Sequence, residues 1–128
     1  IKEPLREQTQ ILLVDTMGML GAFYTICDLA FIGGTISKKG GHNFLEAAIL
    51  GKAILSGPYF YNTPDVALKL FEEGGAMQVS NASFLTQLEK FVSNKNFAKQ
   101  AGAKAQNVAL SFKGATEKTI SIIKNYGK

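Results

Sequence analysis

The sequence FIGGTISKKGGHNFLEAAILGKAILSGP (Phe31–Pro58) contains a strand pattern, a glycine-rich loop, a helix pattern and a second strand pattern in direct succession. Two Gly pairs, at positions 33–34 and 40–41, bracket a short basic loop, and Asn43 stands where a helix would begin. Glycines remove side chains from a loop, and the first N–H groups of a helix have no acceptor within the helix. The stretch therefore predicts backbone N–H groups that face an anion. A plain glycine-rich connection is the alternative.

The helix inside this stretch has recognisable start and stop signals. Asn43 is a candidate N-cap, Glu46 stands three residues later as in a capping box, and Gly51 can close the C-terminus. Glu46 has two interpretations that do not exclude each other. Its carboxylate can accept the backbone N–H of Asn43, or it can accept both hydroxyls of a ribose from its place one turn into the helix.

The same alternation extends outward in both directions. We expect strands at 11–14 (ILLV), 29–34, 53–58 and 76–79, and helices at 17–27, 43–51, 63–75, 81–92 and from 96 onward. Short connections between strands and helices indicate a parallel sheet flanked by helices, so the fold class is α/β and Rossmann-like. Such sheets have about five or six strands. Only four are visible here, which suggests a part of a longer protein.

Local signals also predict helix caps and core faces. We expect Thr16 to cap the helix that starts at Met17, Thr63 followed by Pro64 to start the third helix, and Asn81 to cap the fourth. Gly114 is expected to bend or break the last helix. The residues expected on core faces of the last two helices are Phe84, Leu85, Leu88, Phe91, Val92, Phe97, Ala101, Val108 and Phe112.

Composition narrows the function classes. The chain has 128 residues, 46% of them hydrophobic, which favours a single domain over residues 1–128 with C-terminal helices at about 96–126. A net charge of +4 modestly favours anionic partners, but a single Arg argues against nucleic acid. The lone Cys27 excludes a disulfide framework and fits a reducing compartment. The sequence contains no membrane-spanning run, no His/Cys metal cluster and no GxSxG nucleophile motif.

Taken together and in order, DTMGML, CDLAFIGGTI, GGHNFLEAAILGK and SGP resemble the C-terminal half of the bacterial 3-deoxy-D-manno-octulosonic acid (Kdo) transferases. The resemblance runs from about Ile11 to Leu88. It implies one half of a GT-B glycosyltransferase, which has two Rossmann-like domains, and it implies that this half binds the donor CMP-Kdo. It also implies that no metal or other cofactor is needed, because helix dipoles and basic groups stabilise the departing phosphate.

The resemblance assigns roles to individual residues. The substrate-binding set that it implies is Met17, Gly18, Gly34, Gly41, His42, Asn43 and Glu46. Glu46 would hold the ribose. Gly41, His42 and Asn43, with the helix N-terminus, would face the phosphate. The backbone at 17–18 would line the cytidine.

The reaction that the resemblance implies is transfer of Kdo to a lipid A precursor at the cytoplasmic face of the Gram-negative inner membrane. The acceptor site, the catalytic base and a membrane anchor would lie upstream, so this chain alone is expected to be soluble and inactive, with no catalytic residue of its own. Two alternatives stay open. One is a GT-B domain for another, UDP-linked sugar, and the other is a non-catalytic anion-binding module.

Overall fold

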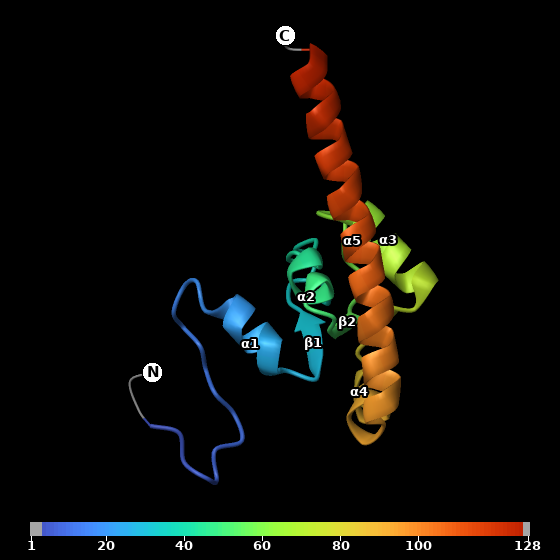
Figure 1. Cartoon of the computed structure of the whole chain (residues 1–128). Coiled ribbons are helices and arrows are strands. Elements are labelled where there is room, and N and C mark those ends of the chain that lie inside the picture. Colours follow the sequence, from blue (N-terminus) through green and yellow to red (C-terminus); the bar gives the residue numbers. More distant parts are fainter. Residues whose placement is uncertain (1–3, 127–128) are drawn as a thin grey trace.

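The computed structural model describes residues 4–126, which form a parallel sheet with helices packed against it (Figure 1). The strands are β1 (Leu29–Ile32), β2 (Ala53–Ser56) and β3 (Ala76–Gln78), in the order β1-β2-β3. The helices are α1 (Leu20–Ile26), α2 (Leu45–Ile49), α3 (Pro64–Glu73), α4 (Phe84–Ser93) and α5 (Lys95–Tyr126). The predicted parallel α/β architecture is therefore confirmed.

The central strand β2 is buried on both faces of the sheet. All four of its residues are buried, because β1 and β3 pair with its two edges and helices pack on both of its faces. Successive side chains of a strand point to opposite faces. Ile54 accordingly packs into a cluster with residues of α2, α3 and α5, whereas Leu55 packs into a second cluster with Phe91 of α4 and Ala101 of α5.

Helix α5 runs along the whole molecule and continues past it (Figure 1). Its predicted apolar stripe is confirmed, since Ala101 and Val108 are buried and Phe112 packs at the edge of the core. The predicted break at Gly114 is wrong, because the helix is continuous from Lys95 to Tyr126. From residue 113 to 125 every side chain is exposed, so this part of α5 extends beyond the core without contacting it closely.

The predicted strand at 11–14 is wrong. The four residues are in no strand, and Ile11 and Leu13 are 89% and 84% exposed. A strand needs a neighbour for its N–H and C=O groups, and none pairs with this segment in the described residues. The predicted cap at Thr16 is also wrong, since α1 begins only at Leu20 and has no side-chain cap.

Helices α3 and α4 show where local signals succeeded and failed. Helix α3 has Pro64 in its first turn and ends at Gly74 in the left-handed conformation, as predicted, although the Thr63 hydroxyl makes no capping bond. Helix α4 is preceded by a turn in which Ser80 and Ser83 bond to each other, in place of the predicted Asn81 cap. Phe91 is buried as expected, but two further residues of the predicted core face, Leu85 and Val92, are exposed.

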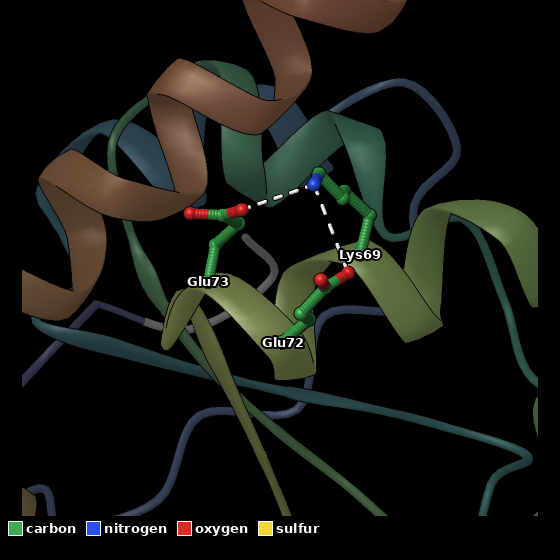
Figure 2. A network of polar contacts seen from close by, with 3 residues as sticks. All are labelled: Lys69, Glu72 and Glu73. Atoms are coloured by element: carbon green, nitrogen blue, oxygen red, sulfur yellow. Dashed lines mark ion pairs between the residues drawn. The ribbon is translucent and has the colours of Figure 1, made fainter.

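Two exposed ion pairs lie on the surface of α3. Lys69 lies between Glu72 and Glu73, with Nζ–carboxylate distances of 3.7 and 3.0 Å (Figure 2). Exposed pairs of this kind contribute little to stability because water and salt screen them. No helix in residues 4–126 is both long enough and apolar enough to cross a membrane.

Candidate functional site

The loops that follow β1 and β2 meet at one edge of the sheet. The two strands are parallel, and Ile32, the last residue of β1, pairs with Ser56, the last residue of β2. The loop after β1 carries both Gly pairs and leads into α2. Ligands of open α/β sheets bind at this carboxyl edge, so both loops belong to the candidate site.

The glycine-rich loop closes on itself. The Gly41 N–H donates to the Gly34 carbonyl at 3.1 Å, and the His42 N–H donates to the Gly33 carbonyl at 3.1 Å. Gly34 and Gly41 both have left-handed backbones, with φ of +75° and +82°. A Cβ on Gly41 would also lie 2.8 Å from Cγ2 of Thr35, so glycine is required there both by conformation and by space.

These bonds correct one part of the sequence-based picture. The N–H groups of Gly41 and His42 were expected to be uncovered, but the loop's own carbonyls accept them. A third donor, the Leu45 N–H, donates to Oδ1 of Asn43 at 2.9 Å. The N–H groups of Asn43 and Phe44 donate to no residue that the structure describes. The exposed start of α2 therefore offers fewer donors than predicted.

Asn43 and Glu46 do not form a capping box. The Leu45 N–H, the first of α2, donates to the side chain of Asn43, but the residue at the N-cap position is Phe44 and not Asn43 as predicted. Glu46 is exposed, and within residues 4–126 it makes neither the hydrogen bond to the Asn43 N–H nor an ion pair. The pKa of Tyr24 is raised above its ordinary value, mainly by burial and then by the charges of Glu46 and Cys27. The Glu46 carboxylate is thus open to a ligand.

Glu46 lies between two pockets. The larger, of about 820 Å³, lies between residues 14–23 and α2 and is lined by Met17, Gly18 and Glu46 among others. Met17 is 96% exposed, and a Cβ on Gly18 would meet no atom within 4 Å. The second, of about 430 Å³, lies between α2 and α5 and is lined by Asn43, Glu46 and residues of α5.

The structure thus brings Met17, Gly18 and Glu46 together, with Asn43 on the other side of Glu46. Three predicted residues, at positions 34, 41 and 42, line neither of these two pockets. Gly41 is buried in the loop turn, and Gly34 is half-buried beside it. The His42 side chain is exposed, and its ring lies over Gly33, where a Cβ would be 3.3 Å from Cδ2 of His42.

Sequence reasoning missed the residues that hold the loop from its other side. The Asn62 side chain donates to the carbonyls of Lys39 and Gly41, at 3.1 and 3.0 Å. The buried hydroxyl of Thr35 accepts the Gly57 N–H at 2.8 Å. The available signal was an Asn in the loop after the next strand, since short polar side chains commonly bond to backbone groups of loops.

No group of three or more His, Cys, Asp or Glu side chains close enough to share a metal ion occurs among residues 4–126. The site presents the exposed carboxylate of Glu46, the N–H group of Asn43, the imidazole of His42, and the exposed lysines 38 and 39 of the loop; the Phe44 N–H is buried.

No protein-family model matches the chain, but individual proteins do. It is 30% identical over 122 residues to the 3-deoxy-D-manno-octulosonic acid transferase of Haemophilus influenzae, covering 94% of this chain and 29% of that protein. It is 36% identical over 102 residues to the transferase of the same name from Rickettsia typhi, covering 80% and 22%. The chain thus spans less than a third of the length of these relatives.

A solved structure supports the same relationship. The C-terminal CMP-Kdo binding domain of WaaA from Acinetobacter baumannii superposes with a TM-score of 0.71 and 26% identity, covering 78% of this chain and 53% of that one. The expected Rossmann-like half of such a transferase is therefore confirmed as the fold. By sequence along most of its length and by fold, the chain is homologous to part of the 3-deoxy-D-manno-octulosonic acid transferases.

Proposed function

We propose that the chain, over all 128 residues, is the domain that binds the donor CMP-Kdo in a glycosyltransferase. The whole protein would transfer Kdo to a lipid A precursor in lipopolysaccharide biosynthesis. The observation that carries the proposal is the pocket of about 820 Å³ where Met17, Gly18 and Glu46 converge. These three come from two separate motifs of the family resemblance, and the A. baumannii neighbour is a CMP-Kdo binding domain.

The nucleoside would occupy this pocket. Val14, Leu20 and Phe23 provide apolar surface for the cytosine ring, and the backbone at 17–18 is open because Gly18 has no side chain. An ionised carboxylate only accepts hydrogen bonds, so Glu46 suits the two ribose hydroxyls, which donate them. Glu46 is also free of the capping-box bond that would otherwise occupy it.

The phosphate would lie at the start of α2. The Asn43 N–H would donate to it, together with the exposed His42 ring and the basic loop residues 38 and 39. Gly34 and Gly41 would act indirectly, by giving the loop its left-handed turns. Hydrogen bonds to a charged phosphate are stronger than neutral ones, which offsets the small number of donors.

The chemical step would be direct displacement at the Kdo anomeric carbon. A base outside these 128 residues would take the proton of the acceptor hydroxyl, while the phosphate site described above stabilises the negative charge of departing CMP. No cofactor is required by this scheme. The chain alone would bind donor without transferring it, because a leaving-group site without a positioned nucleophile gives no reaction.

We also assign the partners of the whole protein by this proposal. They are CMP-Kdo as donor, a lipid A precursor as acceptor, and the cytoplasmic face of the inner membrane, where the acceptor lipid would be reached. The net charge of +4 is compatible with an anionic surface. Nucleic acid is not a proposed partner.

An NMR titration of the 128-residue chain with CMP and with UMP tests the proposal. We expect CMP to shift amides of residues 16–21 and 42–46 and to bind more tightly than UMP. Glu46→Ala should weaken CMP binding, followed by the shifts at 16–21, by about tenfold or more while the domain stays folded. Glu117→Ala, which removes the same charge from the neighbouring pocket, is the matched control and should bind CMP normally. Tighter binding of UMP would favour a UDP-sugar donor. Absence of binding to either nucleotide would favour the alternative of a non-catalytic module.

A further inference from the structure

Asn62 binds three consecutive carbonyls of the glycine-rich loop. Its side-chain Nδ2 donates to Lys39 at 3.1 Å and to Gly41 at 3.0 Å, and its backbone N–H donates to Gly40 at 3.0 Å. No other residue described in the structure bonds to so much of this loop. Neighbouring Tyr61 extends the contact by donating its hydroxyl to the Lys38 carbonyl at 2.6 Å.

The chemistry of this contact requires an amide. Both side-chain bonds end on carbonyl oxygens, which only accept, so the NH2 group of Asn62 must face the loop. A carboxylate at this position would have no proton to donate. The loop is also too close for a larger residue at position 40, because a Cβ on Gly40 would overlap the Tyr61 ring and lie 2.8 Å from Cγ of Asn62.

Hydrogen bonds are the main means of fixing this loop. The residues from Ser37 to Asn43 (SKKGGHN) include no apolar side chain that could anchor the loop in the core. On one side the Gly41 and His42 N–H groups bond to the end of β1, and on the other side Asn62 holds the carbonyls. A segment without packed side chains takes its position from such bonds. The next residue along the chain, Asn43, begins the proposed phosphate site.

We propose that Asn62 is a positioning residue that holds residues 39–43 where His42 and the Asn43 N–H can reach the phosphate of the bound nucleotide. This inference rests on the proposed function of the same site. It adds a residue from a different loop, at the end of β2, that acts on the phosphate without touching it. Asn62 should therefore affect ligands that carry the phosphate and not those that lack it.

The experiment compares CMP with cytidine on the 128-residue chain and on Asn62→Ala, using NMR shifts at residues 16–21 and 42–46. Loss of both side-chain bonds should weaken CMP binding by about tenfold or more. Cytidine lacks the phosphate and relies on the pocket around Glu46, so its affinity should change by less than about twofold. A substitution that only destabilised the domain would lower the affinity for both ligands or for neither.

Asn94→Ala is the matched control. It removes a side-chain hydrogen bond of similar length, in which the Phe97 N–H donates to Oδ1 of Asn94 at 3.0 Å, at the start of α5 and away from the loop. It should leave both affinities unchanged. If Asn62→Ala does not fold, Asn62→Gln keeps the amide but displaces it by one methylene, and the same selective loss of CMP affinity is expected.

Three outcomes would contradict us, and they differ. CMP binding that is unchanged in Asn62→Ala overturns the inference alone. Equal losses for CMP and cytidine also overturn it, because Asn62 would then act on the whole domain. Failure of the unsubstituted chain to bind CMP overturns the proposed function and, with it, the inference.

Discussion

Gly102→Ala should destabilise the domain, although it places a better helix former inside a helix. Gly102 is buried in α5 where that helix crosses the turn after α2. A Cβ there would overlap the Gly51 carbonyl oxygen, and it would lie 2.9 Å from the Gly51 carbonyl carbon and 3.3 Å from the Ala53 N. All three atoms are backbone, so no flexible side chain can move aside.

Two opposing effects decide the sign. In a helix interior, replacing Gly by Ala normally gains about 0.8–1.0 kcal/mol. Forcing a methyl group into a packed contact costs about 1–3 kcal/mol, and contact with backbone atoms that cannot move aside favours the upper end of that range. The balance is a loss of about 2 kcal/mol in the free energy of unfolding. At about 4 °C per kcal/mol for a domain of this size, the melting temperature should fall by about 8 °C.

Urea denaturation followed by circular dichroism measures this change. The control is Gly114→Ala on the same helix, where a Cβ would meet nothing within 4 Å. That variant should be as stable as the wild type or more stable by up to about 1 kcal/mol. The reasoning is refuted if Gly102→Ala unfolds at the same or a higher urea concentration than the wild type, because α5 would then not approach the α2 turn so closely.

Three further predictions concern stability. Phe44→Ala should cost about 3–5 kcal/mol by thermal denaturation, because this side chain is fully buried at the start of α2. Thr35→Val should cost about 1–3 kcal/mol, because it leaves the buried Gly57 N–H without its acceptor, whereas Thr35→Ser should cost less. Burial raises the pKa of Tyr24 above its ordinary 10.0, so stability that is present below pH 10 should be lost as the pH rises through the raised pKa. Denaturation at pH 9 and 11 checks this, and Tyr24→Phe should flatten the dependence.

Much of the fold could be predicted because its signals are local. The strands at 29–32, 53–56 and 76–78 follow short apolar runs, and helix α3 follows from Pro64 at its start and Gly74 at its end. The run at 11–14 shows the limit of such reasoning. An apolar run indicates that a segment can be buried, but whether it becomes a strand depends on a partner that the run itself does not specify.

The candidate site could be predicted only in part, for a similar reason. The sequence indicated that Asn43 bonds to the start of α2 and placed Glu46 near the ligand edge, because both depend on one short helix. It could not show that the Gly41 N–H is already bonded, since that bond depends on how the glycines close the loop. Nor could it pair Asn62 with this loop, because the two come from segments more than 20 residues apart whose contact depends on the sheet.

One measurement tests the central claim most directly, namely that the pocket beside Gly18 binds CMP through the carboxylate of Glu46. It compares the affinity of the chain for CMP with that for 2′,3′-dideoxycytidine monophosphate, in the wild type and in Glu46→Ala. The wild type should bind CMP about tenfold or more tightly than the analogue, because the analogue lacks both hydroxyls whose hydrogen bonds Glu46 would accept. Glu46→Ala should bind the two equally. A preference for CMP that survives in Glu46→Ala would contradict the account, because the ribose would then be recognised elsewhere.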